Sequence, residues 1–147
     1  MDSKTTAKAE LVGLKVMKAS EMIQDSANAL FKLHGLSSPQ YNVLRILRGA
    51  GGPGLNCQEI SARMLKRVPD ITRLLDRLVK KGLVDRTRSD EDRRVVVSGI
   101  TRQGLKLLKT LDNPLEKQVA GNFDHLDNNE MNRLDKLLDR LLAGLGT

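Results

Sequence analysis

The segment 69–100 constrains the fold of this chain more than any other part of the sequence. Four apolar residues from Ile71 to Leu78 fall at positions i, i+3, i+4 and i+7, which is the spacing of one buried helix face, while the opposite face is basic. A glycine follows as a helix stop. Two stretches with strand-like character, 83–88 and 94–100, come next and flank a charged tip. The pattern predicts a helix that leads directly into a β-hairpin with arginines at its tip.

Further helices are expected on both sides of this segment, because apolar residues there recur at intervals of three and four. Two pairs have the spacing of helix N-terminal caps, Ser37 with Gln40 and Asn56 with Glu59. In chain order, the expected helices cover about 6–34, 38–48, 57–65, 69–81, 102–111 and 128–142. The dipeptide Asn113-Pro114 is expected to interrupt or kink the fifth of these, with helix resuming to about residue 119.

The first and last helices carry more apolar surface than a chain of this size can cover alone. The first is long for a small domain and needs a partner along much of its length. The last presents a wide leucine face, which consists of Leu134, Leu137, Leu138, Leu141, Leu142 and Leu145. Such a face is typical of a core or of a dimer interface, so we expect a homodimer.

The net charge of +7 is confined to one part of the chain. Residues 55–111 hold 14 of the 25 Lys and Arg residues but only 7 of the 18 acidic residues, so the remainder of the chain is neutral. A basic block on a neutral carrier is typical of a protein that binds a polyanion. The alternative is a solvated basic face that has no partner.

Several classes of protein are disfavoured by the sequence. The single cysteine, Cys57, excludes an intramolecular disulfide, and His34 and His125 lack neighbours with metal-ligand spacing, so we expect no metal site. No paired carboxylates, nucleophile elbow or phosphate loop is evident, and we expect no catalytic residues, no cofactor and no enzyme activity. No apolar run is long enough for a transmembrane helix or a signal-peptide core. We therefore expect a cytoplasmic protein without a membrane partner.

Two short helices, a tight turn and a hairpin together describe a winged helix-turn-helix. The expected fold class is mainly α with a small β-hairpin wing. A helix with its side chains is about 12 Å across and fits the major groove, while an arginine-rich hairpin tip can reach the minor groove or the backbone. Double-stranded DNA is therefore the expected partner. The candidate DNA-binding residues are Thr72, Arg73, Arg77 and Lys80 on the helix and Arg86, Arg88, Arg93 and Arg94 on the hairpin.

These residues also resemble the MarR-type winged-helix regulators. The segment 36–41 is similar to the start of the second helix in that family, and 71–84 is similar to its recognition helix and the strand that follows. The residues that match its wing signature are Asp92, Arg93, Arg94, Ile100, Thr101 and the later Gly104. The resemblance is specific over about 36–108, whereas the flanking helices match only in kind.

The resemblance implies an organisation in two lobes. Residues 36–101 would form the winged helix-turn-helix DNA-binding lobe, and 1–35 with 102–147 a helical dimerisation lobe. It further implies a homodimer on a pseudo-palindromic operator, usually acting as a repressor, and an Asp92 that orients Arg94 in the wing. A small phenolic or anionic effector would bind between the lobes and change the spacing of the two recognition helices.

One departure and two alternatives accompany this interpretation. Pro69 and Asp70 stand at the start of the recognition helix, and Asp70 repels phosphate unless it pairs with Arg73 or accepts from a cytosine amino group. A winged-helix protein-interaction module without a DNA target is a second interpretation. A thiol-based redox regulator is a third, because Cys57 begins a predicted helix, where cysteines can be reactive.

Overall fold

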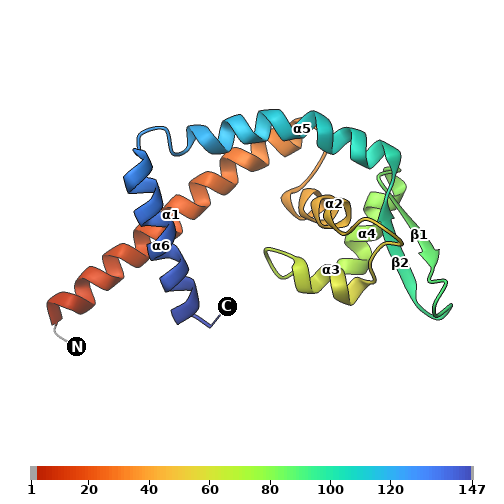
Figure 1. Cartoon of the computed structure of the whole chain (residues 1–147), viewed down its shortest axis with the longest axis horizontal. Helices are drawn as coiled ribbons and strands as arrows, with labels where there is room; N and C mark the ends of the chain where they lie inside the picture. The colour runs from red at the N-terminus through yellow and green to blue at the C-terminus, as the bar shows by residue number, and fades with distance from the viewer. Residues whose placement is uncertain (1–2, 147) are drawn as a thin grey trace.

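The computed structural model describes residues 3–146 and is mainly helical with one antiparallel hairpin (Figure 1). The helices are α1 Ser3–Leu33, α2 Ser38–Ala50, α3 Cys57–Arg63, α4 Ile71–Lys80, α5 Arg102–Gly121 and α6 Asn128–Gly144. The strands are β1 Val84–Arg88 and β2 Val96–Ile100. The predicted fold class, mainly α with a hairpin wing, is confirmed.

The molecule divides into a compact cluster and a pair of extended arms (Figure 1). Helices α2, α3 and α4 pack together beside the hairpin at one end. Helices α1 and α5 run next to each other across the top of this cluster, and the amide of Gln118 donates to the carbonyl and hydroxyl oxygens of Ser26 at 2.5 Å. The first half of α1 and all of α6 extend away from the cluster.

The hydrophobic core belongs to the cluster and to the adjoining ends of α1 and α5. Its fully buried large side chains are Val43, Leu44, Ile60, Leu75, Leu78, Val84, Leu108 and Leu111. Phe31 at the end of α1 stacks on Tyr41 of α2 with ring centroids 4.2 Å apart. Arg48 of α2 donates twice to the carboxylate of Asp112 on α5, at 2.9 Å each. These contacts hold the cluster against the two long helices.

The base of the hairpin contains a third, very short strand segment. β1 and β2 pair in register from Val84 opposite Ile100 to Arg88 opposite Val96, and Leu55 forms an isolated bridge to Ser98 on the other edge of β2. Gly54 precedes this bridge with φ of 95°, and a Cβ there would lie 2.4 Å from the carbonyl oxygen of Ser98. Only glycine therefore allows the chain to approach β2 before α3 begins.

The junction between hairpin and α5 explains the glycine of the wing signature. The hydroxyl of Thr101 donates to the carbonyl of Gly82 at 2.7 Å and accepts from the backbone N–H of Gly104 at 3.1 Å as the cap of α5. A Cβ on Gly104 would lie 2.5 Å from the carbonyl oxygen of Leu83. The first turn of α5 thus packs directly on the backbone that leaves α4.

The predicted start of α4 at Pro69 is wrong, and so is the predicted interruption of α5 at Pro114. Pro69 does not open α4, because Asp70 is the N-cap and Ile71 the first helical residue. Pro114 does not interrupt α5, which is one helix across that position. The proline removes one backbone hydrogen bond, whereas the packing of Leu111 and Leu115 and the Gln118 bonds to α1 hold the helix on both sides.

The remaining helices agree with the sequence within about two or three residues, the usual uncertainty of helix ends. Both predicted caps, Ser37 with Gln40 and Asn56 with Glu59, are complete capping boxes. Within residues 3–146, no helix has the combination of length and apolar character needed to cross a membrane.

Candidate nucleic-acid interface

Helix α4 presents one apolar and one cationic face. Leu74, Leu75 and Leu78 are buried, as the i, i+3, i+4, i+7 pattern predicts. Asp70 accepts from the backbone N–H of Arg73 at 3.0 Å and thereby caps the helix, so its carboxylate is used inside the fold. The side chain of Asp70 is therefore a cap and makes no ion pair with the guanidinium of Arg73.

The outward face of α4 is exposed along its whole length. It carries four of the predicted DNA-binding residues, Thr72, Arg73, Arg77 and Lys80. Within residues 3–146, no hydrogen bond or ion pair of the side chains of Arg73, Arg77 and Lys80 is found. Three adjacent cations without an acidic partner form a surface that an anion with regularly spaced charges can neutralise. We call Arg73, Arg77 and Lys80 together the cationic face of α4.

The neighbouring Lys81 has a different role from the cationic face. Its ammonium donates to the backbone carbonyl of Gly35, and the amide oxygen of Gln40 lies 3.5 Å away. These contacts join the C-terminal end of α4 to the turn before α2. Lys81 thus orients α4 on the cluster.

Arg86 differs from the other predicted DNA-binding residues because its side chain is bonded to α4. Its Nη1 donates to Oδ1 of Asp76 at 2.5 Å, and its Nη2 donates to the carbonyl oxygen of Thr72 at 3.2 Å. Its side chain is only 26% exposed, whereas that of Arg94 is 91% exposed. The structure therefore brings Arg86 against α4 and away from the open surface.

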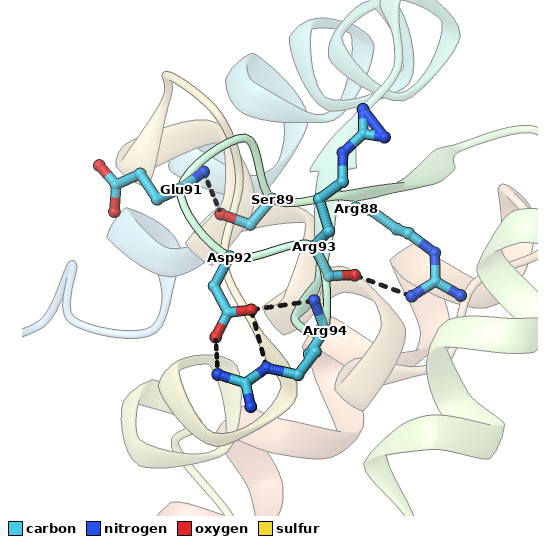
Figure 2. A network of polar contacts seen from close by, with 6 residues as sticks. All are labelled: Arg88, Ser89, Glu91, Asp92, Arg93 and Arg94. Atoms are coloured by element: carbon cyan, nitrogen blue, oxygen red, sulfur yellow. Dashed lines mark hydrogen bonds and ion pairs between the residues drawn. The ribbon is translucent and has the colours of Figure 1, made fainter.

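The tip of the hairpin is organised by Asp92 (Figure 2). One carboxylate oxygen of Asp92 accepts from the backbone N–H of Arg94 at 3.0 Å and from its Nε at 3.2 Å, and the other accepts from Nη2 at 3.4 Å. These bonds from the side chain and backbone of Arg94 hold the pKa of the Asp92 carboxyl below its usual range. Asp92 and Arg94 are thus bonded to each other through both side chain and backbone.

Arg88 and Arg93 extend the same network without joining the clamp between Asp92 and Arg94. Nη1 of Arg88 donates to the backbone carbonyl of Arg93 at 2.8 Å and closes the loop at its base. Figure 2 shows the side chain of Arg93 leaving the loop on the opposite side from Arg94. The tip therefore presents the guanidinium groups of Arg93 and Arg94 in different directions, whereas that of Arg88 is used partly to hold the loop together.

Other candidates from the sequence do not assemble into a site. Among residues 3–146, no group of three or more His, Cys, Asp or Glu residues is placed to hold a metal ion. Cys57 is a free, partly buried thiol in the first turn of α3. His34 and His125 lie in different parts of the fold, His34 directly after α1 and His125 in the connection between α5 and α6.

An open hollow of about 400 Å³ lies between α2 and the end of α3. Ile46 and Leu65 contribute apolar surface, and the guanidinium groups of Arg45 and Arg63 line it without a partner among the described residues. Its lining residues all belong to 36–101. The hollow is thus within the predicted DNA-binding lobe, whereas the family resemblance implies an effector between the lobes.

Sequence reasoning missed three features of this interface. It did not foresee the bond between Arg86 and Asp76, because Asp76 lies ten residues earlier, before the turn that joins α4 to β1. It also missed the bridge between Leu55 and Ser98, for which the glycine before a single apolar residue was the only signal. The backbone use of Arg88 was not foreseen either, because a carbonyl partner leaves no trace in the sequence.

The chain is similar to proteins of one family. The family model described as MarR family matches residues 34–95. The HTH-type transcriptional repressor IacR of Pseudomonas putida is 30% identical over 118 residues, which are 80% of this chain and 70% of IacR. A crystal structure of a MarR transcription factor from Planctomyces limnophilus has a TM-score of 0.70 at 37% identity and covers 88% of this chain and 94% of that one.

A protein–DNA complex has the same fold. The crystal structure of the S. aureus MepR–DNA complex has a TM-score of 0.80 at 21% identity, covering 90% of this chain and 96% of MepR. At that identity the likeness concerns the fold alone.

Proposed function

The chain belongs to the MarR family of DNA-binding transcriptional regulators, and on this premise we propose that it is a homodimeric repressor of a pseudo-palindromic operator. The observation that carries the proposal is the cationic face of α4, whose three cations have no acidic partner among the described residues, next to the clamped Arg94 of the wing. Regularly spaced phosphates are the polyanion that such a surface fits. The name of the relative IacR, a repressor, supports the sign of regulation.

The two DNA-facing elements differ in what they can read. Arg73 and Arg77 lie one turn apart on α4, so both can meet base edges in the major groove. Arg94 projects from the hairpin and would meet the minor groove or a phosphate. Base contacts give specificity and phosphate contacts fix position, so α4 would select the sequence and the wing would anchor the protein.

A homodimer is supported by the apolar surface of the arms. Leu14, Met17 and Met22 of α1 are more than half exposed, as are Leu137 and Leu145 at the end of the chain. An exposed apolar surface of this kind is typical of a protein–protein contact, and a second copy of the chain has the same face to offer. Two copies related by a two-fold axis would present two α4 helices to half-sites about one helical turn apart.

An effector is the least constrained part of the proposal. The structural neighbour BpsR of Bordetella bronchiseptica is described as having its DNA binding regulated by 6-hydroxynicotinic acid. In this chain, the guanidinium groups of Arg45 and Arg63 beside apolar Ile46 and Leu65 suit a small organic anion. Such a ligand changes operator affinity only by its difference in affinity between the two spacings of the recognition helices.

Salt dependence tests the central claim. Affinity for a duplex that the native protein selects from a random-sequence library is expected to fall steeply as the salt concentration rises, because phosphate neutralisation releases counterions. A shallow slope would instead favour a winged-helix protein-interaction module, and equal affinity for every duplex would refute sequence-specific binding. The redox alternative is tested separately: oxidant should leave the operator affinity of the native protein and of Cys57→Ser equally unchanged.

A further inference from the structure

Arg86 connects the wing to the recognition helix at two points. It leaves β1 at the position opposite Ser98 and reaches the carboxylate of Asp76 and the carbonyl oxygen of Thr72. Thr72 and Asp76 are four residues apart and therefore lie one above the other on the same side of α4. A single guanidinium thus holds two successive turns of the helix.

The bonds of Arg86 reach the end of α4 that lies away from its covalent connection to β1. The C-terminal end of α4 is joined to β1 covalently through the short turn at Lys81–Leu83, and Lys81 is bonded to the turn before α2. Thr72 lies at the opposite end of the helix, in its first turn. Arg86 therefore supplies a second connection to the hairpin, at the end of the helix that the covalent connection does not hold.

The strand that carries Arg86 is itself firmly placed. β1 pairs with β2, and β2 is bridged on its other edge by Leu55 through two hydrogen bonds of 2.8 and 3.0 Å. β2 follows the loop that holds Arg94. The route from Thr72 and Asp76 through Arg86 to the wing thus joins the two elements that are proposed to contact DNA.

We propose that Arg86 is a positioning residue that fixes the orientation of α4 relative to the wing, through Asp76 and the carbonyl of Thr72, and that it does not contact DNA. This inference rests on the proposed function, since it concerns how two DNA-binding elements are held together. Its guanidinium already donates to a carboxylate and to a backbone carbonyl, and its side chain is only 26% exposed, so both bonds compete with any contact to a phosphate.

The variant Asp76→Ala tests the proposal by the direction in which it changes operator affinity. If Asp76 is only a solvated negative charge near DNA, its removal reduces repulsion and strengthens binding. If Asp76 holds Arg86, its removal loosens α4 and weakens operator binding. The matched control is Asp85→Ala, since Asp85 is exposed on β1 next to Arg86, makes no side-chain hydrogen bond among the described residues, and gives the same change of charge.

The variant Arg86→Lys separates positioning from phosphate contact. A lysine keeps the positive charge and can neutralise a phosphate, but it lacks the planar fork that bridges a carboxylate and a carbonyl. A phosphate-contacting Arg86 would therefore tolerate lysine, and a positioning Arg86 would not. Arg102→Lys, at an exposed first-turn residue of α5, is the control for the substitution itself.

The experiment measures binding to the selected duplex and to a scrambled duplex across a salt series, with thermal unfolding as a check of folding. We expect Asp76→Ala and Arg86→Lys each to reduce operator affinity about five- to tenfold, the effect of one partly exposed hydrogen bond, with little change on the scrambled duplex. The double variant Asp76→Ala/Arg86→Lys should bind no more weakly than either single variant, since both break one interaction. The salt slope of Arg86→Ala should equal that of the native protein.

Three outcomes would overturn the inference: Asp76→Ala that binds as tightly as Asp85→Ala, Arg86→Lys with native affinity, or a reduced salt slope for Arg86→Ala. Because Arg86→Lys keeps the charge and most of the side chain, it gives a result even if Asp76→Ala fails to fold. Failure of the native protein to bind any duplex would refute the proposed function instead, so the two failures are distinguishable.

Discussion

The middle of the chain and its two ends use apolar residues in opposite ways. Among residues 3–146, every buried apolar side chain lies between Phe31 and Leu111. No residue of α6, which the structure describes in full, is buried, and Leu11, Leu14 and Met17 of α1 are at least 47% exposed. The first region is therefore a folded unit with its own core, and the second is an amphipathic surface that a single chain leaves open.

This difference teaches where each kind of stability arises. The cluster of α2, α3, α4 and the hairpin gains its stability from burial within one chain. In the proposed dimer the arms would be stabilised when two apolar faces meet, so their stability should depend on protein concentration. Substitutions in the two regions should therefore fail in different ways, and five tests can break or sharpen the contrast.

The largest effect is expected from a charge on the face of α6. Leu138→Glu places a carboxylate on the apolar surface that two chains would share, and its desolvation opposes assembly. Because only one half-site would then be bound at a time, operator affinity should fall by about a hundredfold or more. Light scattering and duplex binding on the same sample check both effects.

Leu33→Glu is the control for that experiment. It places the same charge on an exposed leucine at the C-terminal end of α1, next to the core. It should remain dimeric. A native protein that is monomeric at micromolar concentration would refute the dimer. It would also refute the claim that a second chain covers the apolar faces of the arms.

The next effect is a decrease of stability in the core. Leu75→Ala removes a fully buried side chain of α4 and should lower the free energy of unfolding by about 2–5 kcal/mol at every protein concentration. Leu142→Ala, at a half-exposed position of α6, should lower the melting temperature mainly in dilute solution. Melting curves over a range of concentrations distinguish the two. Equal concentration dependence for both variants would mean that the two regions do not differ as described.

The elements of the core region were predictable because several local signals agree there. The leucine stripe of α4, the two capping boxes and the β-branched strands each specify a type of structure from a few neighbouring residues. The bond between Asp92 and Arg94 agrees with what the resemblance to the family's wing signature implies, and the two residues are close in one tight loop. Short-range patterns thus anticipated most of the fold and the wing part of the site.

The remaining features depend on distant partners. Arg86 looks like any other hairpin arginine until the turn at 81–83 brings β1 next to Asp76. Pro114 carries a strong local signal against helix, which packing against α1 and the core overrides. Such outcomes are set by the three-dimensional arrangement, so sequence patterns alone could not have given them.

A smaller effect is expected at the surface of the core region, without any change in assembly. Arg73→Ala removes one exposed guanidinium from α4 and should weaken operator binding by about 1–3 kcal/mol. Because the variant has no side chain to read the base that Arg73 would meet, discrimination should relax at one position in each half-site. Binding to a set of single-base variants of the selected duplex measures this. A uniform decrease on all sequences would assign Arg73 to the phosphates.

Arg94→Ala should change the salt dependence more than the specificity. Its side chain is almost fully exposed and projects from the wing, where phosphates or the minor groove would lie. Removing it should weaken binding to many sequences and flatten the salt slope by roughly one unit for each phosphate that a subunit no longer neutralises. Titrations at several salt concentrations give the slope. If discrimination relaxes while the slope stays native, the wing reads bases and the division of roles is wrong.

The smallest effect is a titration inside the wing itself. The hydrogen bonds from Arg94 hold the pKa of Asp92 below its usual range, so the charged form is favoured in the folded wing. A carboxyl group with a lowered folded pKa stabilises the fold above its unfolded pKa, and that contribution is lost as the pH falls through the folded pKa. The clamp is therefore complete near neutral pH and should open only under acidic conditions. Carboxyl NMR should show Asp92 titrating at higher pH in Arg94→Ala than in the native protein, with dimerisation unaffected at neutral pH. Identical titration curves in the two proteins would show that Arg94 does not hold Asp92, and the wing would then need another source of order.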